Sequence, residues 1–406
     1  MVVETRNRIA RRKQPVLARH RALREFVRRT RIAHRWTTPV MGLFLLIQVI
    51  CGTILLFRPQ LDQMLHPELF AKTESAQAIT ATQAIAAARA VKPDLTGPTA
   101  TLVDGVFQVR SGKAGEAVYV DPGSGAILGT VDPDGGVLGF VTNLHSCALS
   151  CERYPGYQPW LTAKVPVIEL KISQLTLGGI GLTLVWWSLS GLLIWWPGIR
   201  NIKQRLTIHL RRGKYRRNRD LHAVIGVASC AFLLFWGITG AGFELPAIGK
   251  VWYALTGGAP AKSEYNSARA TGPDIGGDRA IAAAAAVVPG GRLVYLAEPS
   301  PKPADTYRVA FAVNTDMGRY GGTVPLPSVI VAVDRHTGDT HFIKGGTDMS
   351  ASTTLWQKWS YGLHFGYLAP WPVRLLWLVF GLAPIALAVT GFRTWYQRRR
   401  RAAPPT

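Results

Sequence analysis

Charged residues are scarce in this chain. Only 17% of its 406 residues are Asp, Glu, Lys or Arg, whereas 48% are hydrophobic, and such a low charged share is unusual for a soluble protein. The sequence also lacks a glycine-rich loop followed by Lys-Ser/Thr, a nucleophile elbow and paired carboxylates within its apolar stretches. These absences count against soluble-enzyme chemistry and favour a membrane protein.

Four apolar stretches are long enough to cross roughly 30 Å of hydrocarbon at about 1.5 Å per residue. A set of buried core helices is the soluble alternative, but flanking arginines and tryptophans fit a soluble core poorly. We therefore predict four membrane-spanning helices, at residues 39–57, 171–197, 221–245 and 370–392.

Acidic residues are also few, at 24 against 47 basic residues. The basic residues gather in three segments, with twelve in 1–38, nine in 198–220 and five in 393–406. With an even number of spans these segments share one side of the membrane, and the positive-inside rule makes that side cytoplasmic. We therefore expect both termini in the cytoplasm and the long connections 58–170 and 246–369 in the periplasm.

The net charge of +23 then needs no nucleic-acid partner, because basic segments beside a bilayer can bind anionic lipid head groups. The first apolar run follows a long arginine-rich stretch and is too long for the core of a signal peptide. We expect no cleavable signal, so the first helix stays as an anchor in the lipid bilayer.

The spans indicate an internal duplication. His34 precedes Gly52 by 18 residues, and His222 precedes Gly240 by the same 18 residues. The runs "GLTLVWWSLSGLLIW" and "GLAPIALAVTGFRTW" superpose without gaps, which aligns the glycine of "LSGLL" with that of "VTGFR". Spans 1 and 3 therefore correspond, as do spans 2 and 4.

Each outward connection repeats one pattern: an alanine-rich helix, at 79–91 or 275–288, and then strand-like runs. In both copies a strand ends in Val-Asp-x-x-Ser/Thr-Gly and turns back, because aspartate caps a turn and glycine accepts a positive φ. The predicted fold class is thus a membrane α-helical bundle of four spans from an internal duplication, with two periplasmic α+β modules.

Four of the nine histidines stand at or near span entrances. Alternating span directions place His34 and His222 at the cytoplasmic face, and His145 and His364 at the outer face. Two neutral imidazoles from facing helices can hold a haem iron from both sides. We therefore predict two haem b groups, with these four histidines as the ligands of the haem iron. The plain alternative is a hydrogen-bonded or snorkelling histidine at each interface.

Two cysteines lie close to His145. Cys147 and Cys151 would have Cα atoms about 6 Å apart on one helical face, within disulfide range, and both face the oxidising side of the predicted topology. We predict a local disulfide, with a redox-active or metal-binding pair as the alternative. His145 precedes its span by about 19 residues more than His364 does, so it could project from a loop or short helix folded over the bundle.

The motifs "AHRW", "CGTILLF", "LHSCAL", "WWSLSGLLIWWPG", "DLHAVIG", "LHFG" and "TGFRTW", interleaved with two Val-Asp-x-x-Ser/Thr-Gly modules, resemble the PepSY-associated transmembrane proteins. That family includes bacterial inner-membrane siderophore reductases and iron-regulated membrane proteins. The resemblance implies PepSY-like modules, haem ligation by the entrance histidines, and electron transfer from an unidentified cytoplasmic donor to a periplasmic ferric siderophore.

The function expected from this resemblance is a haem-b inner-membrane oxidoreductase that acts as a ferric-siderophore reductase. A non-enzymatic PepSY membrane anchor that binds peptides or restrains periplasmic proteases is the alternative. A third possibility is a subunit of an iron or siderophore uptake assembly.

Overall fold

The computed structural model describes residues 2–73, 75, 77–112, 115–260, 264–267, 272–302, 304–313, 329–346, 349–366 and 371–402. The chain divides into two compact units. The bundle unit comprises Met1–Ile50, Gly178–Ala241 and Val379–Thr406, and the sheet unit comprises Cys51–Leu177 and Gly242–Leu378.

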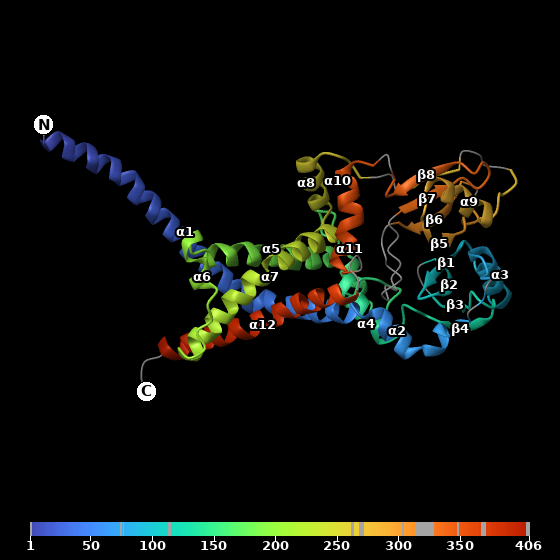
Figure 1. The fold of residues 1–406 in the computed structure, drawn as a ribbon, viewed down its shortest axis with the longest axis horizontal. Helices are drawn as coiled ribbons and strands as arrows, with labels where there is room; N and C mark the ends of the chain where they lie inside the picture. The colour runs from blue at the N-terminus through green and yellow to red at the C-terminus, as the bar shows by residue number, and fades with distance from the viewer. Residues whose placement is uncertain are drawn as a thin grey trace. The chain divides into compact units, whose positions relative to one another are not determined.

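Four helices are long and apolar enough to cross a membrane, and they are the long ribbons in Figure 1. They are α1 (Val2–Leu55), α5 (Ile172–Trp195), α7 (Lys214–Glu244) and α12 (Trp371–Ala402). The linker between α5 and α7 adds η3 (Ile199–Asn201) and α6 (Ile202–Arg205). Helix α1 begins well before the predicted span because the arginine-rich segment continues the same helix. The chain is therefore a multi-pass membrane protein.

All four helices contribute to the core of the bundle unit. Leu45 of α1, Leu184 of α5 and Leu233 of α7 are buried together, and Leu387 of α12 packs against them. Lipid-facing side chains gain little from burial between helices, so contact shape and small residues decide how closely such helices approach.

Helices α5 and α7 approach most closely at glycines. A Cβ built on Gly181 would lie 2.7 Å from the backbone nitrogen of Ala241, and one built on Gly237 would lie 2.9 Å from the carbonyl oxygen of Gly181. These are backbone atoms that cannot rotate away, so only glycine allows the two helices to lie at this separation.

The sheet unit is built around one eight-stranded antiparallel sheet with the order β4-β3-β2-β1-β5-β6-β7-β8 (Figure 1). Its strands are β1 (Pro98–Val103), β2 (Val106–Ser111), β3 (Ala117–Val120), β4 (Ile127–Val131), β5 (Arg292–Ala297), β6 (Tyr307–Ala312), β7 (Val329–Val333) and β8 (Thr340–Lys344). Each half is a four-stranded meander that follows one helix, α3 (Ala81–Val91) or α9 (Gly277–Val287).

Strands β1 and β5 join the two halves, with Ala100 opposite Leu296. Both residues are fully buried in one core that also contains Ile85 of α3 and Ala284 of α9. Helices α3 and α9 pack against one another on this face, so the strands assigned from sequence to two modules share a single sheet and a single core.

The two predicted turns are confirmed. The backbone nitrogen of Gly125 donates to the carbonyl oxygen of Asp121, and that of Gly338 donates to the carbonyl oxygen of Asp334. Both glycines have positive φ, at 75° and 80°. Each aspartate side chain also accepts backbone N–H groups of its own turn, as the Val-Asp-x-x-Ser/Thr-Gly pattern predicts.

Short helices connect the sheet to the ends of the long helices. They are α2 (Arg58–Leu65), η1 (Pro67–Phe70), α4 (Gly136–Cys147), η2 (Pro159–Thr162), α8 (Pro246–Thr256), α10 (Ala351–Thr354), η4 (Leu355–Trp359) and α11 (Ser360–His364). The sequence did not predict β1 or most of these helices, because short apolar runs do not distinguish a strand from a helix.

Candidate functional sites

His34 of α1 and His222 of α7 come together in the bundle unit. The two imidazoles are close enough to interact electrostatically. Each ring also lies against a glycine of a neighbouring long helix: a Cβ built on Gly191 would lie 3.6 Å from Cε1 of His34, and one on Gly391 would lie 3.3 Å from Cε1 of His222. These are the two glycines that the sequence alignment of spans 2 and 4 placed in correspondence.

A hydroxyl group fixes the tautomer of His34. Nδ1 of His34 lies 2.7 Å from Oγ of Ser190, and that hydroxyl donates its own proton to the carbonyl oxygen of Trp186 at 2.5 Å. Since the hydroxyl proton is already used, Ser190 accepts and Nδ1 of His34 donates. The lone pair of the ring is therefore on Nε2, the form of histidine that can bind a metal.

His222 has a matching arrangement. Its Nδ1 lies 3.1 Å from the carbonyl oxygen of Leu387 and 3.2 Å from Oγ1 of Thr390. A carbonyl can only accept, and the Thr390 hydroxyl donates to the carbonyl oxygen of Ala386 at 2.7 Å. Nδ1 of His222 is therefore the donor, and Nε2 carries the lone pair in this ring too.

His145 lies in the last turn of α4, in the sheet unit. Its ring is tight against α1, because a Cβ built on Gly52 would lie only 2.8 Å from Cε1 of His145. Arg58 holds α4 in place by donating to Oγ1 of Thr142 and to the carbonyl oxygen of Pro133, both at 2.6 Å. The first long helix thus both receives the imidazole and anchors the short helix that carries it.

The chain just after His145 is cross-linked. Cys147 and Cys151 form a disulfide, with Cα atoms 5.7 Å apart. Asn143 is fully buried, donates to the carbonyl oxygen of Pro155 at 3.0 Å, and accepts from the backbone nitrogen of Cys151 at 3.1 Å. The disulfide and this asparagine therefore tie the end of α4 to the following loop.

His364 is the last residue of α11 and lies close enough to His145 for the two imidazoles to interact electrostatically. Its ring meets Phe243 edge-on, with centroids 5.1 Å apart. Burial lowers the pKa of His364 to about 3, and the neighbouring His145 contributes in the same direction. The ring is therefore neutral at physiological pH, which is the state required of a metal ligand.

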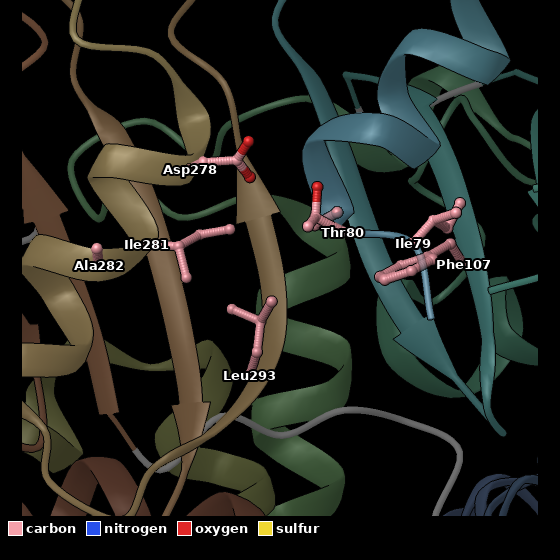
Figure 2. Close-up of a pocket in the computed structure, with 8 residues that line it drawn as sticks. Ile79, Thr80, Phe107, Asp278, Ile281, Ala282 and Leu293 are labelled. Carbon is pink, nitrogen blue, oxygen red and sulfur yellow. The ribbon is translucent and has the colours of Figure 1, made fainter. Parts of the chain in front are cut away.

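A separate groove of about 420 Å³ lies between α3 and α9 on the helix-covered face of the sheet. Figure 2 shows Ile281 and Leu293 on one side of it and Ile79 and Phe107 on the other. Its wall is mostly apolar, so it suits a hydrophobic group better than an ion.

Within the described ranges there is no group of three or more His, Cys, Asp and Glu side chains placed to hold a metal ion. A haem iron needs only two protein ligands, one on each side. Two neutral imidazoles per site, with Nδ1 engaged where the bonds are resolved and small residues beside the rings, fit that group.

Sequence reasoning missed the residues that orient the histidines. Ser190 and Thr390 are the hydroxyl residues immediately before the aligned glycines, so the equivalence of "SG" and "TG" in spans 2 and 4 was the available signal. Arg58 and Asn143 gave no such signal, because their partners are distant backbone and side-chain atoms.

A search of curated proteins found no match. The family model for the PepSY-associated TM region matches residues 31–398. This match covers both histidine pairs, all eight strands and most of each long helix. The chain therefore belongs to the PepSY-associated transmembrane family.

Proposed function

We propose that this chain is a haem-b-containing oxidoreductase of the bacterial inner membrane that passes electrons from a cytoplasmic donor to a periplasmic ferric siderophore. One observation carries the proposal: Nδ1 of His34 and of His222 donates to a partner on a facing helix. Both imidazoles of the inner pair therefore offer Nε2, and chains that merely bury a histidine have no need of that match.

In the inner site, His34 and His222 would hold the haem iron. Ser190 and Thr390 keep both rings in one tautomer and one orientation, which also raises the basicity of the ligating nitrogen. When bound, haem would supply reversible one-electron chemistry that no side chain of the protein offers.

In the outer site, His145 and His364 would hold the second haem iron. The aromatic ring of Phe243 beside His364 limits access of water to this pair. We interpret the two halves of the sheet as two PepSY-like modules, from an internal duplication, that frame the surface where the ferric siderophore is bound as substrate. Family membership supports this choice of substrate.

Histidine substitutions and a visible spectrum test the proposal. The purified protein should show a Soret band and about two haems per chain in a pyridine haemochrome assay. His34→Ala and His222→Ala should each remove about half of the haem, and the double variant should lose no more, because both residues serve one site. His336→Ala, in a hairpin turn, is the matched control and should lose none.

The outer pair gives a second, independent half: His145→Ala and His364→Ala should remove the haem that His34→Ala retains. Colourless protein, prepared with haem supplied during expression, would refute the redox function. Full haem content in His222→Ala would refute the pairing.

The apolar groove between α3 and α9 (Figure 2) favours one second candidate. It suits a hydrophobic peptide side chain, as expected for a non-enzymatic PepSY anchor that binds peptides or restrains periplasmic proteases. A peptide-binding anchor would be colourless, so the same spectrum separates the two functions.

A further inference from the structure

A polar cavity of about 280 Å³ lies in the bundle unit, between the start of α7 and the last turns of α12. It is lined by Lys214, Arg217 and Asn218 of α7 and by Arg393 and Gln397 of α12. Every lining residue carries a hydrogen-bond donor, and three of them are cations. Such a lining suits an anion.

Two amides in this cavity have unused hydrogen-bonding capacity. Asn218 is only 4% exposed, yet across the described ranges its side chain makes no hydrogen bond. The Oε1 atom of Gln397 is also buried, with no partner among the described residues. Buried polar atoms are normally paired, so these two side chains point to a bound group that both accepts and donates hydrogen bonds.

The positive charge of the cavity is not neutralised by nearby carboxylates. The closest acidic residue along α7 is Asp220, and it is already engaged by His209 at 2.9 Å and by Arg219 at 3.2 Å. Within the part of the chain that the structure describes, Arg217 and Arg393 form no ion pair. Their charges are therefore available to a ligand.

The cavity lies where the predicted spans end on the cytoplasmic side, since the apolar run of α7 starts at Leu221. Lipid phosphates of the inner leaflet are found at this level, and basic pockets between membrane helices on that side bind anionic head groups. We propose that this cavity binds the head group of an anionic phospholipid. Arg217, Arg393 and Asn218 contact the phosphate, and Gln397 accepts a hydrogen bond from a head-group hydroxyl.

This inference does not rest on the proposed function. A carboxylate of a haem held by His222 is the competing occupant, because Asn218 precedes His222 by one helical turn and therefore lies on the same face of α7. The hydroxyl-accepting Gln397 favours a glycerol-type head group over both a carboxylate and inorganic phosphate. The experiment distinguishes all three.

The test is native mass spectrometry of the full-length protein in detergent, titrated with dioctanoyl phosphatidylglycerol, dioctanoyl phosphatidylcholine or inorganic phosphate. We expect phosphatidylglycerol to bind most tightly. Arg217→Gln/Arg393→Gln should weaken that binding about 30-fold, the effect of removing two cations near a lipid phosphate. Asn218→Ala should weaken it without any change in charge, and unchanged elution and thermal unfolding will show that each variant is folded.

Arg211→Gln/Arg212→Gln is the matched control, because it removes two exposed cations from the same linker outside the cavity. It should bind phosphatidylglycerol like the wild type. Equal affinity for the two lipids, or equal affinity in Arg217→Gln/Arg393→Gln and wild type, would overturn the proposal. So would inorganic phosphate binding as tightly as the lipid, or a loss of haem from the cavity variant with unchanged lipid binding. Colourless wild-type protein would leave the lipid titration intact.

Discussion

The imidazole of His145 lies so close to Gly52 that a Cβ at that glycine would come within 2.8 Å of Cε1. Real Cβ atoms essentially never approach so closely, and the ring is the part that would have to shift. Gly52 of α1 therefore sets the position of a histidine that is carried by a different helix, α4.

We predict that Gly52→Ala perturbs the outer site and leaves the inner site unchanged. The added methyl displaces the ring of His145, so haem content should fall from about two toward one per chain, or the redox potential of one haem should change. Gly42→Ala on the same helix is the control, because its Cβ would meet only Thr38, at an ordinary 3.7 Å. Identical redox titrations of both variants would contradict this role of Gly52.

Ser190→Ala should weaken the inner site more than Thr390→Ala does. Ser190 is the only residue to accept from Nδ1 of His34 in the described part of the chain, whereas His222 keeps the carbonyl oxygen of Leu387 when Thr390 is lost. Loss of such an orienting partner typically costs 10–100-fold in metal affinity. Haem-transfer kinetics to apomyoglobin would measure it.

Ser190→Thr keeps the hydroxyl and should restore haem retention. If Ser190→Ala and Ser190→Thr released haem at the same rate, the hydrogen bond would not be what orients His34.

The sequence predicted the histidine pairs because their spacing repeats, and repetition is visible without coordinates. His34 and His222 stand in equivalent frames, and so do the turns at Asp121 and Asp334. These features depend on local sequence and on span direction, both of which follow from the chain alone.

Other parts of the site depend on contacts between distant segments. The clamp of Arg58 on Thr142 joins α2 to α4 across 84 positions, and no local pattern marks either residue. Strand β1 was missed for a similar reason: "PTATLV" has weak alternation by itself, and its pairing with β2 and β5 stabilises it. Tertiary context decided both.

Removing the disulfide should loosen the outer site. In the chain-entropy account, a cross-link over a loop this short contributes roughly 2 kcal/mol to the free energy of unfolding. We predict that Cys147→Ser/Cys151→Ser lowers the thermal stability of the protein and speeds haem loss from the outer site, since His145 lies two residues before the bond. A reductant should produce the same change in wild type and none in the double variant. Equal haem release with and without reductant would separate the disulfide from His145.

The turn aspartate Asp121 predicts an acid-sensitive stability. Burial by itself raises its pKa, but hydrogen bonds from Ser124, Thr73 and Gly123 outweigh burial and hold the pKa below its ordinary value. A folded-state pKa below the unfolded value of about 3.9 stabilises the fold above that pH, and this contribution is lost as the pH falls. Asp121→Asn should therefore be less stable than wild type at pH 7, and the gap should narrow below about pH 4. A gap in unfolding free energy that stays constant from pH 7 to 3 would contradict this.

Gly181→Ala should separate α5 from α7. Its methyl would meet the backbone of Ala241 at 2.7 Å and of Gly237 at 2.9 Å, and overpacking of this kind typically costs about 1–3 kcal/mol. Gly179→Ala, two residues earlier on α5, is the matched control, because no atom lies within 4 Å of its Cβ position. That variant should be neutral or slightly stabilising, since alanine favours a helix over glycine. Thermal unfolding in detergent measures both variants, and since Gly181 contacts neither histidine pair, a loss of stability in Gly181→Ala should precede any loss of bound haem.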